Sequence, residues 1–252
     1  MVIAVFDSGF GGLSLLYEAM KKLEGCDFIY FADNENAPYG TKNIDEIKKL
    51  SIDAVDFLAS KADIVVIACN TATSAAVSDL REKFSIPIIG MEPAVNLGKD
   101  ADGDILVIAT PATIKGAKLN ELLKKSNLNN KTHLLPMPKL VEFAQNMEFN
   151  SPNVKEYIKN QISKFNSKNI SLLVLGCTHF NYFKDNFIDL MPNSKIVDGV
   201  DGTIRQIKRK IDELNSKGKN LDTKLLYYSS KKQKDINLIT PFISRLDKMA
   251  KI

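Results

Sequence analysis

The sequence is poor in the residues that disulfide scaffolds and metal centres require. Its 252 residues include only three cysteines and two histidines, and no C-x-x-C pair occurs. Three is an odd number and too small for a disulfide-stapled fold, so we expect reduced thiols and a cytoplasmic protein. So few histidines and cysteines also disfavour a metal site.

Long apolar runs, leader signals and blocks of like charge are missing as well. No stretch approaches the roughly 18 apolar residues that suggest a membrane span, and the N-terminal MVIAVFDSGFGG lacks the basic segment of a signal peptide. The net charge of +4 comes from lysines spread along the chain, which disfavours a nucleic-acid tail. We therefore expect a globular protein without a nucleic-acid or membrane partner.

The sequence does contain a regular alternation of short apolar runs and segments with helical spacing. Between residues 44 and 58, for example, apolar residues recur three or four positions apart, which is typical of a helix. Strands that alternate with helices predict crossover connections and parallel sheets. Strands are predicted at residues 2–6, 28–32, 64–68, 86–90, 105–109, 133–137, 172–176, 195–197 and 224–228.

Proline, glycine and charged residues gather around residues 91–103 and 198–203, as at domain boundaries. These two places divide the chain into a first α/β domain, residues 1–92 plus 203–252, and a second, residues 93–202. The expected fold class is thus α/β, with two similar domains that each contain a mostly parallel sheet flanked by helices.

Two cysteines end matching apolar runs, Cys69 in VVIACNTATSAA and Cys177 in LLVLGCTHFNYF. The carboxyl end of a parallel strand is where open α/β sheets bind ligands, and the N-terminus of the following helix stabilises a thiolate. A single such cysteine is usually a small buried hydrophobe, as we interpret Cys26. Two of them, each followed by polar donors and placed in different halves, favour a pair of acid/base groups around one ligand.

Three other motifs come directly after predicted strands, and each has a structural alternative. The glycine-rich DSGFGG at residues 7–12 lets the backbone approach a ligand, or forms a capped turn. The Pro38-Tyr39-Gly40 segment forms a loop, or uses its hydroxyl and backbone N–H groups to hold a carboxylate. The segment from Thr110 to Thr113 caps a helix, or supplies a donor to the same cleft.

Several segments in order, VFDSGFGGLS, FADNENAPYGTK, IACNTAT, PIIGMEPA, ATPATIK and VLGCTHF, resemble those of the glutamate racemases in the aspartate/glutamate racemase superfamily. The resemblance covers most of the chain. It implies an active site in the cleft between two α/β domains and interconversion of L- and D-glutamate without pyridoxal phosphate, metal or other cofactor. It also implies a homodimer that supplies D-glutamate for peptidoglycan synthesis.

Roles for individual residues also come from this resemblance. Cys69 and Cys177 would be the two bases, with Asp7 assisting the first and His179 the second. The residues implied to bind the substrate are Ser8, Tyr39, Gly40, Asn70, Thr71, Thr113, Thr178 and Glu142.

The segment MPKLVEFAQ departs from the family pattern. Either Glu142 or Gln145 therefore takes the place of the family's glutamate in the second domain.

Other activities remain as alternatives. A different racemase of the superfamily would act on aspartate, hydantoins or maleate, and a Cys–His hydrolase would leave Cys69 unused. A two-domain binding protein that clamps a small acid would have no need of two thiols.

Overall fold

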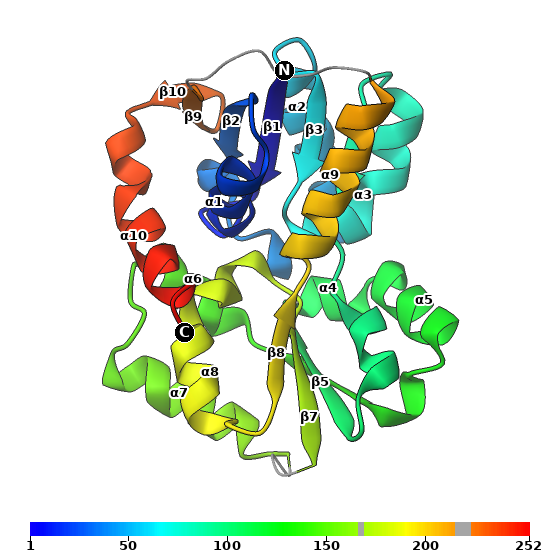
Figure 1. Cartoon of the computed structure of the whole chain (residues 1–252), viewed down its shortest axis with the longest axis vertical. Coiled ribbons are helices and arrows are strands. Elements are labelled where there is room, and N and C mark those ends of the chain that lie inside the picture. The colour runs from blue at the N-terminus through cyan, green and yellow to red at the C-terminus, as the bar shows by residue number, and fades with distance from the viewer. Residues whose placement is uncertain (166–168, 215–222) are drawn as a thin grey trace.

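The chain folds into two α/β units, each built on its own sheet, as the computed structural model shows (Figure 1). The structure describes residues 1–165, 169–214 and 223–252. The first sheet has the strand order β10-β9-β2-β1-β3-β4, and the second has the order β6-β5-β7-β8. The predicted fold class is confirmed.

All nine predicted strands are present, and every neighbouring pair among them is parallel. A further strand, β10, pairs antiparallel with β9 across the turn residues Ser230 and Lys231, both with positive φ. Such two-residue turns with φ > 0 match the twist of a hairpin. The strands are β1 Val2–Asp7, β2 Asp27–Ala32, β3 Ile64–Ile67, β4 Ile88–Gly90, β5 Asp104–Ala109, β6 Thr132–Pro136, β7 Ile170–Leu175, β8 Lys195–Asp198, β9 Leu225–Ser229 and β10 Lys232–Lys234.

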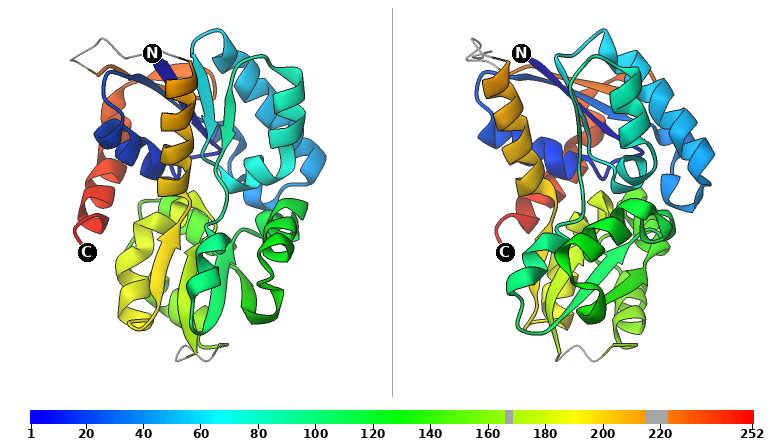
Figure 2. Two further views of the ribbon diagram at one scale, coloured as in Figure 1. Left: turned by 45° about the vertical axis from the view of Figure 1, so that its right-hand side comes forward. Right: turned by 90° about the vertical axis from the view of Figure 1, so that its right-hand side faces the viewer.

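Helices flank both sheets (Figures 1 and 2). In the first unit, α1 packs against α9 and against α10, and α2 packs against α3. Among the described residues, every helix is too short or too polar to span a lipid bilayer. The helices are α1 Leu13–Lys22, α2 Ile44–Ala59, α3 Asn70–Lys83, α4 Pro111–Lys115, α5 Ala117–Ser126, α6 Pro138–Gln145, α7 Pro152–Ile162, α8 Lys184–Leu190, α9 Val200–Glu213 and α10 Thr240–Met249.

Strands β1 to β4 of the first sheet are buried on both faces, which explains their continuous apolar runs. Along β1, Ile3 and Val5 belong to the core on the α1 side, whereas Ala4 and Phe6 belong to the core under α2 and α3. Successive side chains of a strand point to opposite faces, so an all-apolar strand requires cover on both sides. The parallel arrangement also brings the carboxyl ends of β1, β2 and β3 to one edge.

The chain passes between the sheets twice, after β4 and after β8, and β9 and β10 return to the first sheet. We therefore propose a division into two domains at residues 1–92 plus 203–252 and residues 93–202. Residues 215–222 of the first range lie outside the described residues.

Candidate active site

The carboxyl ends of β1, β3 and β7 supply residues to one buried cavity. Ser8 lies just after β1, Cys69 just after β3, and Cys177 just after β7, so the two thiols come from different sheets and line the same space. The lining consists of Ser8, Pro38, Tyr39, Gly40, Cys69, Asn70, Thr71, Thr110, Val141, Cys177, Thr178 and His179.

The cavity is closed in this structure. The cavity volume is only about 10 Å³. That space suffices for about one water molecule. Cys69 and Cys177 are 5% and 7% exposed. A ligand of amino-acid size therefore enters only after the surrounding segments move apart.

Cys69 caps the N-terminus of α3, as the sequence pattern predicts. Its Sγ accepts a hydrogen bond from the backbone N–H of Ala72 at 3.4 Å and lies 3.6 Å from Oγ of Ser8. These contacts favour a thiolate, but burial outweighs them and raises the pKa of Cys69 to about 11. The closed site thus holds a neutral thiol.

Cys177 lies in a different local structure from the one that the sequence pattern predicts. The 3-10 helix η5 (Thr178–Phe183), rather than an α-helix, begins directly after it, and no side-chain capping bond is formed. The Cys177 Sγ lies 3.8 Å from Nδ1 of His179. Burial raises the pKa of Cys177 well above its usual value and lowers the pKa of His179 to about 3, so this imidazole is neutral at physiological pH.

Asp7 links the two units. Its carboxylate accepts hydrogen bonds from the Gly9 backbone N–H at 2.9 Å and from the Thr178 hydroxyl at 3.0 Å. It acts on Cys69 only through its charge, which raises the pKa of that thiol. Burial raises the pKa of Asp7 itself from 3.8 to about 7, so the group can gain or lose a proton near neutral pH.

The raised pKa of Asp7 predicts a specific pH dependence of stability. Between about pH 4 and pH 7 the unfolded chain has released this proton while the folded chain retains it. Because the unfolded state binds fewer protons in this window, the free energy of unfolding falls as the pH rises, by up to about 4 kcal/mol. The variant Asp7→Asn cannot ionise at this position. The free energy of unfolding in urea of the variant minus that of the unmodified protein should therefore be more positive at pH 7.5 than at pH 4.5. An equal difference at both pH values would contradict the assignment.

Three threonine hydroxyls form a cluster beside the cavity. The Thr71 hydroxyl lies 2.9 Å from that of Thr110 and 3.1 Å from that of Thr113. Thr110 caps α4 by accepting from the Thr113 backbone N–H, so the predicted cap is present. Thr110 lines the cavity, whereas Thr113 is absent from the lining and contacts Thr71 instead.

The Tyr39 hydroxyl, expected to hold a carboxylate, has another partner. It donates to Oδ2 of Asp33 at 2.6 Å, and Asp33 also accepts from Asn36 and Ser230. The buried Asp33 thus holds the hydroxyl of Tyr39, a residue that also lines the cavity.

Glu142 lies apart from the two thiols. It is exposed and lines an outer pocket that also includes Phe10 and Gln145, not the inner cavity. Gln145, by contrast, reaches His179, with 3.2 Å between the two Nε2 atoms. Of the two residues left open by the sequence, Gln145 is therefore the one in contact with the candidate site. The spacing of Val141, which lines the cavity, and Gln145 is i,i+4 on α6, so both share one helix face.

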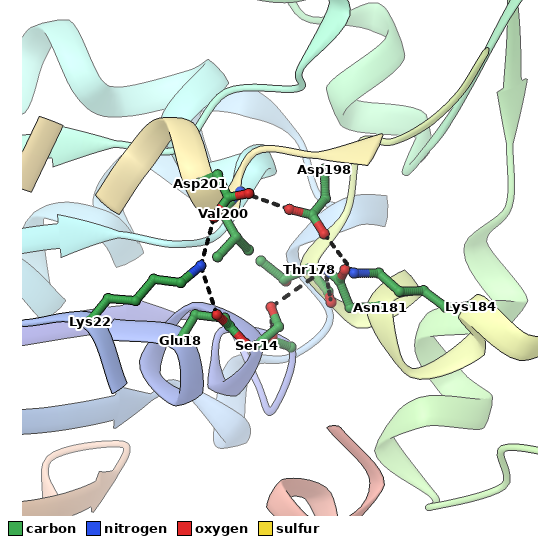
Figure 3. A network of polar contacts seen from close by, with 10 residues as sticks. Ser14, Glu18, Lys22, Thr178, Asn181, Lys184, Asp198, Val200 and Asp201 are labelled. Atoms are coloured by element: carbon green, nitrogen blue, oxygen red, sulfur yellow. Dashed lines mark hydrogen bonds and ion pairs between the residues drawn. The ribbon is translucent and has the colours of Figure 1, made fainter. Parts of the chain in front are cut away.

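A second polar network joins the units beyond Thr178 (Figure 3). Lys22 of α1 pairs with Glu18 at 2.9 Å and with Asp201 of α9 at 2.8 Å. The Asn181 amide donates to the Thr178 carbonyl at 3.2 Å and lies 3.5 Å from Oγ of Ser14. These contacts hold η5 and α9 against α1. Among the described residues, no cluster of three or more His, Cys, Asp or Glu side chains could hold a metal ion.

Comparison with known proteins places this geometry in a family. Residues 15–207 match the family model described as "Asp/Glu/Hydantoin racemase". A protein of Campylobacter concisus named glutamate racemase is 49% identical, with all of both chains covered.

Solved structures agree. A Francisella tularensis glutamate racemase in complex with D-glutamate has a TM-score of 0.81 and 28% identity, covering 99% of this chain and 93% of that one. An Escherichia coli glutamate racemase in complex with L-glutamate and the activator UDP-MurNAc-ala has a TM-score of 0.79 and 26% identity, covering 99% and 94%. The chain therefore belongs to the Asp/Glu/Hydantoin racemase family and is a racemase.

Proposed function

We propose that this protein interconverts L- and D-glutamate without a cofactor, with Cys69 and Cys177 as the two bases. The observation that carries the proposal is that thiols from two different sheets line one buried cavity. Similarity to proteins named glutamate racemase, two of them solved with D-glutamate and with L-glutamate, supports glutamate as the substrate.

Racemisation then proceeds by two proton transfers at the α-carbon. One cysteine, as a thiolate, takes the α-proton from one face, and the other, as a thiol, gives a proton to the opposite face. The two exchange protonation states in each turnover. Because burial raises the pKa of both thiols, the thiolate needs a nearby positive charge, which the α-ammonium of bound glutamate supplies.

The negative charge that develops on the substrate must be met by dipoles. Among the described residues, no arginine or lysine lines the cavity; the donors there are hydroxyl groups and amides, among them Ser8, Asn70, Thr71 and Thr178. Donors fixed in a closed, dry site stabilise developing charge far more than they would in water. We assign these residues, rather than Glu142, to binding the carboxylates and the ammonium.

The direct test incubates L-glutamate or D-glutamate with the pure, reduced, cofactor-free protein. Circular dichroism should decay to zero from either enantiomer, and in D₂O one deuterium should enter the α-position of the product. Aspartate in the same assay tests the competing substrate. Ligand binding without loss of optical activity would support the two-domain binding protein instead.

The cellular role is part of the same proposal. We propose that the protein works in the cytoplasm, where its three cysteines, free in the structure, stay reduced, and that it supplies D-glutamate for peptidoglycan. Rescue of a bacterial strain that requires D-glutamate would test this role. A homodimer, also proposed, would be tested by sedimentation equilibrium.

A further inference from the structure

A continuous line of polar contacts leads from the outer pocket to the second thiol. Gln145 lines the outer pocket, its amide nitrogen lies 3.2 Å from Nε2 of His179, and Nδ1 of the same ring lies 3.8 Å from Sγ of Cys177. His179 is 2% exposed, so its two ring nitrogens face protein groups rather than bulk water.

These contacts determine where the imidazole carries its proton. A neutral imidazole has one N–H donor and one acceptor nitrogen, and burial keeps His179 neutral. In the amide orientation of this structure the Gln145 nitrogen faces Nε2. An amide nitrogen can only donate, so in this orientation Nε2 accepts and has no proton. The proton then resides on Nδ1, from which it points toward Cys177.

We propose that Gln145 is a positioning residue for the second base: it holds His179 as the Nδ1–H tautomer, which donates a hydrogen bond to Cys177 when that sulfur is a thiolate. This inference rests on the proposed function. A donor to the thiolate offsets part of the burial that disfavours it. The Cys69 side is built differently, since Cys69 contacts Ser8 and the Ala72 backbone rather than an imidazole.

Gln145 also contacts the glycine-rich loop of the other unit. A Cβ atom built on Gly9 would lie 1.8 Å from Nε2 of Gln145 and 3.2 Å from Nε2 of His179. In the closed site Gln145 therefore occupies the space that a side chain at position 9 would fill. The Gln145 side chain thus lies between Gly9 of the first unit and His179 of the second. A side chain held on both sides keeps its amide nitrogen against Nε2.

The first test observes the tautomer and needs no activity. The chain has two histidines, so ¹⁵N labelling of histidine gives two sets of signals, and His133→Gln assigns them. We expect His179 of the unmodified protein to show a protonated Nδ1 and an unprotonated Nε2. In Gln145→Glu the carboxylate accepts from Nε2, so the proton should move to Nε2. A protonated Nε2 in the unmodified protein would overturn the proposal.

The second test separates the two proton transfers. Gln145→Met keeps the size of the side chain but removes the hydrogen bond, which should lower kcat/KM by roughly tenfold. The decrease must be equal in both directions, since two enantiomers have an equilibrium constant of one. The isotope effect of α-deuterated substrate should rise for the enantiomer that Cys177 deprotonates and fall for the other.

Gln161 provides a matched control for Gln145. Gln161→Met, on α7 and away from the cavity, should change neither tautomer nor isotope effects. If Gln145 only packs against Gly9, Gln145→Met will change the isotope effects of both enantiomers alike or not at all, which would refute the assignment. Failure of the proposed function would instead be seen as an unmodified protein that does not racemise glutamate.

Discussion

Replacement of either Cys69 or Cys177 by alanine should abolish racemisation, with kcat/KM reduced by at least about 10³-fold in both directions. Each thiol serves one face of the α-carbon, so one thiol cannot replace the other. Polarimetry or circular dichroism from each enantiomer measures the loss. In D₂O, neither variant should give product that carries deuterium at the α-carbon.

The third cysteine provides the control. Cys26 is buried in the core on the α1 side, and its Sγ lies 3.7 Å from the Glu24 carbonyl oxygen, far along the sheet from the cavity. Cys26→Ala should retain the unmodified rate, apart from a modest loss of stability. Full activity in Cys69→Ala or in Cys177→Ala would refute the two-base assignment.

Gly11→Ala should lower kcat/KM by about 100-fold without unfolding either unit. A Cβ atom at Gly11 would lie 2.3 Å from Oγ1 of Thr178, 2.5 Å from Nδ1 of His179 and 2.7 Å from the His179 backbone nitrogen. Because a backbone atom is among these neighbours, side-chain rotation alone cannot relieve the overlap. The loop and η5 must separate, which stretches the bond from Thr178 to Asp7. Displacements near 1 Å at a catalytic group cost about this much activity.

The same substitution at a glycine far from the cavity shows whether the loss of activity comes from the site or from the added methyl group alone. Gly202 lies in α9, and the nearest atom to a Cβ built there is Nη2 of Arg205 at 3.8 Å. Gly202→Ala should keep full activity and slightly stabilise the helix, since alanine favours helices. Far-UV circular dichroism and thermal unfolding would show that both variants fold. Unmodified rates in Gly11→Ala would mean that the glycine-rich loop is not part of the closed site.

Much of the fold can be predicted because its signals are local. The apolar strands and the helical spacing between residues 44 and 58 reflect periodicities of the chain itself, and α2 is found there at Ile44–Ala59. The hairpin of β9 and β10 escapes prediction because Lys232–Lys234 is fully polar, so no apolar alternation marks it as a strand.

The candidate site is predictable only in part. Ser8, Cys69 and Cys177, which lie within two residues of the end of a strand, line the cavity, because parallel topology brings strand ends together. Residues on helices and loops depend on packing that no local pattern describes. Glu142 and Gln145 are one helical turn apart on α6, and only the approach of α6 to η5 decides which of them meets His179.

The protonation states of the titratable groups around the cavity also cannot be predicted from the sequence. Helix N-termini after each cysteine predict stabilised thiolates, but burial of both sulfurs reverses the sign of the pKa shift. Burial is a property of the closed arrangement of two units, and it affects Asp7 and His179 as well.

The sequence by itself therefore determined an α/β chain with a thiol at the carboxyl end of one strand in each half. This was possible because the periodicities of strands and helices depend only on residues close together in the sequence. Only the tertiary structure decided that the two thiols share one cavity, that Tyr39 is bound by Asp33, and that Gln145 meets His179. The physical reason is that the first and third of these depend on how the two units pack against each other, and the second on how the loop after β2 folds back on itself, which no periodicity of the sequence describes.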